Sequence, residues 1–116
     1  MKIANRDARK FVQKQHPFQG NNLYAQFHTQ NNKDGTNGPD MWYAVYSYGG
    51  HWPLFIYAND TWFENEDKYG TTTSKHRTQC HPHTPTVLLS TAWMKLLADG
   101  GYQAIAQQRI LKGEPA

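Results

Sequence analysis

The chain has 116 residues, of which 38% are hydrophobic and 14% aromatic, and its net charge is +3. This length is typical of one domain, and so many large rings can build a core, so we expect a single folded domain over residues 1–116. One cysteine excludes an internal disulfide, and the sequence shows neither a secretory signal nor an apolar run long enough to cross a membrane, so we expect a cytoplasmic protein.

Residues 5–15 are expected to form the first helix, with Asn5 as its N-cap. Ala8, Phe11 and Val12 share one face of this helix, and we expect Phe11 to lie in the core. The opposite face carries four basic side chains: Arg6, Arg9, Lys10 and Lys14. This basic face is a candidate contact for nucleic acid or for an acidic protein surface, and a solvated helix face is the alternative.

The middle of the chain predicts an antiparallel meander of about four strands. The expected strands are residues 22–29, 41–48, 51–58 and 61–65, joined by a loop at 30–40 and by turns at Gly49-Gly50 and Asn59-Asp60. Four tyrosines of this region are candidates for stacking on bases, with a sheet face covered by helices as the alternative: Tyr24, Tyr46, Tyr48 and Tyr57.

The last third predicts helices. Residues 71–83 favour a short helix ended by Pro82, and residues 86–98 and 102–111 favour two more. The second of these shows an apolar stripe centred on Trp93, which we expect in the core; the stripe comprises Leu89, Ala92, Trp93, Leu96 and Leu97. The predicted fold class is therefore α+β, an antiparallel meander of about four strands flanked by an N-terminal helix and two C-terminal helices.

Charge is divided between two regions. Residues 1–14 carry five basic side chains against one acidic side chain, whereas residues 60–67 carry four acidic ones, Asp60, Glu64, Glu66 and Asp67. The acidic side chains are expected to keep a hairpin soluble rather than to act as a general acid–base pair. We therefore predict a basic end and an acidic hairpin that form separate partner contacts.

Residues 71–83 are the chemically most unusual segment. Cys80 stands near His76, His81 and His83, and these residue types bind zinc, but their spacing differs from that of zinc motifs, so we expect no metal. The hydroxyls and cations from Thr71 to Arg77 fit either a phosphate contact or ordinary capping at a helix start. No catalytic signature surrounds Cys80, so we expect neither an enzyme nor a cofactor.

The central residues also follow a recognisable pattern. Its parts are YAVYSYG at 43–49, Pro53-Leu54, Trp62, Asn65, Lys68-Tyr69 and TTSKH at 72–76. Together they resemble a type of small phage and mobile-element protein of mostly unknown function, although Gly70 stands where that type has serine. The resemblance implies a phage or mobile-element origin and a bacterial host. It also implies that Thr72, Thr73 and His76 are held by hydrogen bonds, as a binding site or as a structural staple.

Two functions are compatible with these features. The first is a non-catalytic inhibitor or adaptor that binds a host protein or nucleoprotein complex, for example a CRISPR effector, which would make it an anti-CRISPR. The alternative is a nucleic-acid-binding accessory protein that uses the basic first helix and the Thr71–Arg77 segment. The candidate partner-binding residues are Arg6, Arg9, Lys10, Lys14, Tyr48, Lys75, His76 and Arg77.

Overall fold

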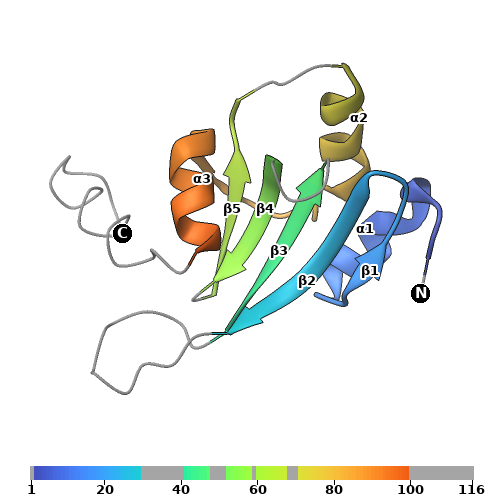
Figure 1. Ribbon diagram of the computed structural model, residues 1–116, viewed down its shortest axis with the longest axis horizontal. Helices are drawn as coiled ribbons and strands as arrows, with labels where there is room; N and C mark the ends of the chain where they lie inside the picture. Colours follow the sequence, from blue (N-terminus) through green and yellow to red (C-terminus); the bar gives the residue numbers. More distant parts are fainter. Residues whose placement is uncertain (1, 30–40, 48–51, 59, 68–70, 100–116) are drawn as a thin grey trace, which may run out of the picture.

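The computed structural model describes residues 2–29, 41–47, 52–58, 60–67 and 71–99, with residues 71–74 described as backbone only. Its helices are the short 3₁₀ helix η1 (Asn5–Asp7), α1 (Ala8–Gln13), α2 (Thr71–Cys80) and α3 (Thr91–Ala98). Its strands are β1 (Phe18–Gln19), β2 (Leu23–Thr29), β3 (Met41–Ser47), β4 (Trp52–Ala58), β5 (Thr61–Asn65) and β6 (Val87–Leu89). The α+β class is confirmed (Figure 1). In the described ranges, every helix is too short or too polar to cross a membrane.

All six strands lie in one sheet in chain order. Neighbouring strands from β1 to β5 are antiparallel, whereas β6 runs parallel to β5. The predicted meander corresponds to β2–β5, but β1 and β6 extend it into a mixed sheet. The parallel pair arises because α2 carries the chain between β5 and β6, which a tight turn could not do. Pro53 falls at the second position of β4, beside a register shift at Val45/Tyr46, where the missing N–H of proline is tolerated.

Helices cover both faces of the sheet (Figure 1). Tyr43 and Val45 of β3 pack with Ala8 and Val12 of α1 and with Cys80 of α2. The alternate residues of the same strand face the other way. On that face they form a second core with side chains of α3, and this core includes Trp42, Ala44, Tyr46, Met94 and Leu97. The central strand is apolar on both faces because each face supports a separate core.

The first helix differs from its prediction at both ends. Asp7, not Asn5, is the N-cap of α1. The Asn5 side chain instead holds the β1–β2 turn, since its Oδ1 accepts from Asn21 N at 2.8 Å and its Nδ2 donates to Asn21 O at 3.0 Å. Past the helix, Gln15 adopts a φ of 55° and donates its N–H to Val12 O at 3.0 Å. The next N–H, from His16, reaches Phe11 O at 2.8 Å, which completes a Schellman motif with glutamine in the usual glycine position.

The predicted helix over residues 86–98 is wrong in its first part and in its buried face. Residues 87–89 form β6, and α3 begins at Thr91 with Ser90 as its N-cap. Its buried side chains are Met94, Leu97 and Ala98, whereas Trp93 is half-buried at the margin of the core. Phe11 is likewise partly buried against its core rather than inside it. The predicted loop 30–40, the Gly49-Gly50 turn and the helix 102–111 lie outside the described residues.

Candidate functional site

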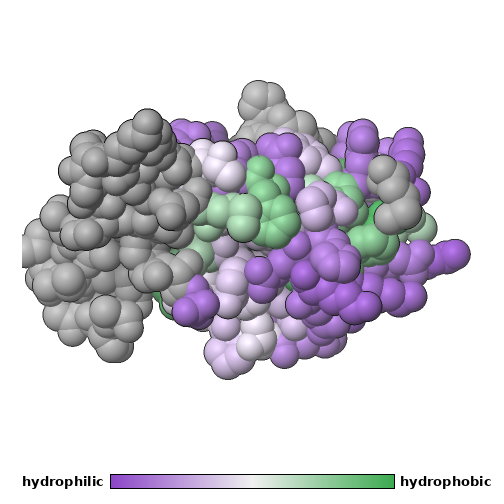
Figure 2. All heavy atoms as spheres, turned by 90° about the horizontal axis from the view of Figure 1, so that it is seen from below, coloured by the Kyte–Doolittle hydropathy of each residue, from purple (hydrophilic) through white to green (hydrophobic). Residues whose placement is uncertain are grey.

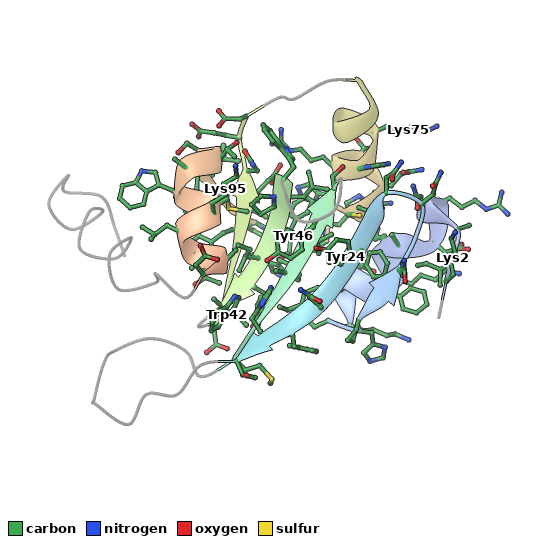
Figure 3. The ribbon with its side chains drawn as sticks, in the orientation of Figure 1. Lys2, Tyr24, Trp42, Tyr46, Lys75 and Lys95 are labelled. Atoms are coloured by element: carbon green, nitrogen blue, oxygen red, sulfur yellow. The ribbon has the colours of Figure 1, made fainter. Side chains whose placement is uncertain are left out.

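Four of the predicted partner-binding residues are exposed, and all four belong to the η1, α1 and α2 side of the molecule. They are Arg6 in η1, Lys10 in α1, Lys14 just after α1, and Lys75 in α2, and we call them the basic surface. Figure 3 shows Lys75 extending away from α2. Lys10 Nζ lies 3.9 Å from the Asp7 carboxylate, and both side chains are largely exposed, so this pair contributes little to stability. Tyr48 lies outside the described residues.

Arg9 does not share the free exposure of its helix neighbours. Its Nε donates to His81 O at 2.9 Å, and its Nη2 donates to Thr78 O at 2.6 Å. These carbonyls lie at and just beyond the C-terminal end of α2, where the helix dipole is negative and attracts a cation. Arg9 therefore ties α1 to α2, which corrects its prediction as a partner-binding residue and leaves Arg6, Lys10 and Lys14 on that face.

Arg77 is also used internally, because it neutralises a buried carboxylate. Glu64 is only 5% exposed, and the Arg77 guanidinium pairs with its Oε2. Its Oε1 accepts from Thr86 Oγ1 at 2.5 Å and lies 3.2 Å from His81 Nε2. Burial acts to raise the pKa of Glu64, but the hydrogen bonds from Thr86 and Arg77, with the nearby charges of Arg77 and His81, hold it below its ordinary value.

The predicted acidic hairpin is therefore not a uniform contact. Glu64 is buried, and Asp67 Oδ2 accepts the backbone N–H of Thr91 at 2.7 Å, at the start of α3. That hydrogen bond lowers the pKa of Asp67, as expected for a carboxylate beside a helix N-terminus. Asp60 and Glu66 remain as exposed acidic side chains of the same segment.

His76 is buried between three elements, with 4% of its surface exposed. Its Nδ1 lies 2.8 Å from Ser47 Oγ in β3, and its Nε2 lies 3.4 Å from Asn5 Nδ2 in η1. Burial, with the nearby charge of Lys75, lowers the pKa of His76 and favours the neutral ring. Of the two roles implied by the sequence, these contacts favour the structural staple.

The cysteine and histidine side chains of α2 and of the residues after it make different contacts. Cys80 is buried, and burial raises the pKa of its thiol to about 12, so it carries no thiolate at neutral pH. His81 faces Glu64 with Nε2 and accepts the His83 N–H with Nδ1 at 3.0 Å. Over the described residues, no three histidine, cysteine or acidic side chains are grouped to hold a metal ion.

Two of the four tyrosines that were candidates for base stacking, Tyr24 and Tyr46, pack on each other. Tyr24 and Tyr46 stack with ring centroids 5.2 Å apart, and Figure 3 shows them side by side on β2 and β3. Tyr46 is buried, its hydroxyl lies 2.8 Å from His28 Nε2, and burial raises its pKa to about 12. Tyr24 is half-buried, so for this pair of rings the structure favours the alternative of a covered sheet face over base stacking.

Protein-family models, curated proteins and solved structures give no match to this chain.

The sequence interpretation missed a groove at the end of the sheet where β2 ends and β3 begins. Two adjoining hollows of about 430 and 270 Å³ share Gln15, Tyr57 and Asp60, and we call them together the aromatic groove. The larger is also lined by Trp62 and residues 84–87, and the smaller by Phe27, Met41, Trp42 and Tyr43. Figure 2, seen from this side, shows hydrophobic side chains near the centre of the view with hydrophilic ones beside them. The available sequence signal was the pair of aromatic residues, 57 and 62, on either side of a turn.

The rings of the aromatic groove are fixed at steep angles to each other. Tyr57 and Trp62 lie 5.1 Å apart at 56°, and Tyr43 and Trp62 lie 6.1 Å apart at 90°. The Tyr57 hydroxyl donates to Asp60 Oδ1 at 3.4 Å, which places a carboxylate beside the rings. Phe27 and Met41 remain 39% and 54% exposed, so the smaller hollow has an apolar rim. The groove can take an apolar or cationic group.

Proposed function

We propose that this is a non-catalytic binding protein, made by a phage or mobile element, that inhibits a host protein or nucleoprotein complex in the bacterial cytoplasm. A CRISPR effector is an example of such a target. The observation that carries the proposal is a difference in exposure between two groups of polar side chains. Three side chains with reactive potential, Cys80, His76 and Glu64, are buried in internal contacts, whereas the basic surface is left exposed. The resemblance of residues 43–76 to small phage proteins supports the origin.

The basic surface is suited to an acidic partner. Its cations come from η1, from α1 and the residue after it, and from α2, three helices that contact one another, so they approach a partner together. Exposed charges of one sign accelerate association with a complementary surface and fix its orientation, more than they add affinity. The contribution of this surface is therefore a fast, orientation-specific encounter with a negatively charged region of the target.

A second candidate function is direct binding of nucleic acid. The observation that favours it is the presence of Lys75 on α2 beside the cations of η1 and α1, because such a surface can span several phosphates. Phosphate binding weakens steeply with salt, with a slope of about −0.9 per phosphate contacted in double-stranded DNA. A protein partner that also uses apolar contacts retains more of its affinity as salt rises.

Inhibition of host defence can be measured directly. A bacterium with an active CRISPR system is made to express the protein, and plating of a phage targeted by that system is counted. We expect wild-type protein to restore plating and a Arg6→Glu/Lys10→Glu/Lys14→Glu variant to lose this effect. Arg9 is left unchanged because it holds α1 to α2.

A matched pair of single reversals serves as the control. Lys10→Glu and Lys95→Glu each reverse one exposed helical lysine, but Lys95 lies on α3, which covers the opposite face of the sheet (Figure 3). Lys10→Glu should weaken the effect more than Lys95→Glu. No restoration of plating by folded wild-type protein would remove that CRISPR system as the target.

A further inference from the structure

We propose that the aromatic groove binds an extended segment of a partner protein through the cationic side chain of an arginine or lysine. This site adjoins the basic surface, since Gln15 of the groove directly follows Lys14 in the chain, but it has the opposite charge preference. The inference rests on the proposed function only in assigning the protein a binding role.

The charge of the groove favours a cation. Among the described residues that line the two hollows, Asp60 is the one with a charged side chain, and it lines both. No cation in the described part of the chain forms an ion pair with it. Its backbone has a φ of 60°, a conformation that aspartate and asparagine adopt more readily than other side chains. A positively charged group entering the groove would thus meet an exposed carboxylate.

The rings beside Asp60 favour the same class of group. Cations are attracted to the faces of tryptophan and tyrosine rings within about 6 Å of the ring centroid. Tyr57 is half-buried and Trp62 is 9% exposed, and both line the larger hollow, so a cationic group there would contact the Tyr57 ring and the exposed part of Trp62. Trp62 is held from behind by Tyr43 and by Phe55, whose ring lies 6.5 Å away at 85°. The rings are therefore positioned before a ligand arrives, which lowers the entropy lost on binding.

The size and apolar rim of the groove favour a peptide segment over a small free cation. The hollow that contains Trp62 has a volume of about 430 Å³, and the adjoining one adds about 270 Å³. Exposed Phe27 and Met41 border the second hollow. An apolar residue next to the arginine or lysine would cover these two side chains while the cation pairs with Asp60.

Gln15 supplies the remaining polar group. It lines both hollows and has a φ of 55° at a helix end where glycine is the residue usually found. Glycine would relieve the backbone but remove the side-chain amide, which can donate to and accept from a peptide backbone. The glutamine therefore gives the groove a hydrogen-bonding group at some expense of stability.

The test uses an acetylated, amidated peptide, Gly-Ser-Leu-Arg-Leu-Ser-Gly, and its counterpart with uncharged citrulline in place of arginine. Amide and indole signals of ¹⁵N-labelled protein are followed by NMR, and the Trp62 indole signal is assigned with a Trp62→Phe variant. We expect saturable shifts at Trp62 and at the Asp60 amide with the arginine peptide. The citrulline peptide should bind about tenfold more weakly, a change of about 1.4 kcal/mol.

The matched variants are Asp60→Asn and Glu66→Gln, each of which removes one exposed negative charge. Asparagine also tolerates the backbone of residue 60, so Asp60→Asn keeps the turn and should lose most of the preference for arginine over citrulline. Glu66→Gln should keep that preference. Equal affinity for both peptides, no saturable shift at Trp62, or groove shifts that depend on protein concentration without peptide would each overturn the proposal. The last result would identify a second copy of this chain as the occupant. If the wild-type protein does not restore phage plating, the proposed function fails but the peptide-binding measurement is unaffected. The failure of one proposal can therefore be told from the failure of the other.

Discussion

Truncation of Arg77 to alanine tests whether this side chain belongs to the fold or to a partner site. In Arg77→Ala, the Glu64 carboxylate would keep Thr86 and His81 as neighbours but lose the guanidinium that neutralises it. Removal of one partner of a buried ion pair costs about 3–5 kcal/mol. Because the Arg77 side chain is 27% exposed and other contacts to Glu64 remain, we expect the lower end, about 3 kcal/mol. That loss is a large share of the about 5–15 kcal/mol that stabilises a typical domain.

Urea denaturation at neutral pH, followed by tryptophan fluorescence, gives the free energy of unfolding of wild type and Arg77→Ala. Glu64→Gln should cost less, because it leaves a partly exposed guanidinium that water can solvate. The double variant should show a coupling between the two sites. An Arg77→Ala protein within about 0.5 kcal/mol of wild type would refute the structural role and return Arg77 to the candidate partner contacts.

The same pair predicts the acid dependence of stability. The folded-state pKa of Glu64 lies below its ordinary value of 4.5, so the unfolded chain binds the extra proton first as pH falls. The stability supplied by its contacts is therefore complete above pH 4.5 and is lost as pH falls through the folded-state pKa. We expect the difference in unfolding free energy between wild type and Glu64→Gln to shrink on acidification. A difference in unfolding free energy that stays constant with pH would contradict a lowered pKa for Glu64 in the folded protein.

Three further outcomes follow from the packing. Gln15→Gly should raise the free energy of unfolding by about 1 kcal/mol in urea denaturation, because it relieves a left-handed residue, and a loss of stability would contradict this. Cys80 should react with a thiol reagent only after denaturation, and rapid labelling of folded protein would show an accessible thiolate. Met94→Ala should lower the free energy of unfolding by about 2–5 kcal/mol in urea melts, and by more than Trp93→Ala, because Met94 is fully buried and Trp93 is not. A larger loss for Trp93→Ala would instead support the sequence-based prediction that Trp93 lies in the core.

The strands of the meander could be predicted because their signals are local. Alternation in residues 22–29 and the tight-turn residues around 49–50 and 59–60 predict consecutive strands, and β2–β5 pair in that order. β6 could not be found in this way. It has three residues in an apolar run that continues into α3, and it exists because β5 offers an edge to pair with. Ser90 was the local signal for the true helix start, since its side chain caps α3.

The candidate site was harder to predict because it depends on what packs beside each residue. A helical projection places Arg9 opposite Phe11, but it contains no information about the end of α2 that Arg9 contacts. Strand alternation places Glu64 on the same face as buried Trp62, and its charge led to the opposite expectation of a solvated hairpin. The aromatic groove joins residues from Gln15, just after α1, to Val87 in β6, so no single segment of the sequence reveals it.

The central claim, a non-catalytic protein that binds a protein partner through its basic surface, is tested most directly by affinity capture from a nuclease-treated bacterial lysate. Wild-type protein, the Arg6→Glu/Lys10→Glu/Lys14→Glu variant and Lys95→Glu are compared after each is shown to be folded. We predict that wild type and Lys95→Glu retain the same host protein after nuclease treatment and that the triple variant loses it. Retention that disappears with nuclease, or equal retention by the triple variant, would contradict the claim.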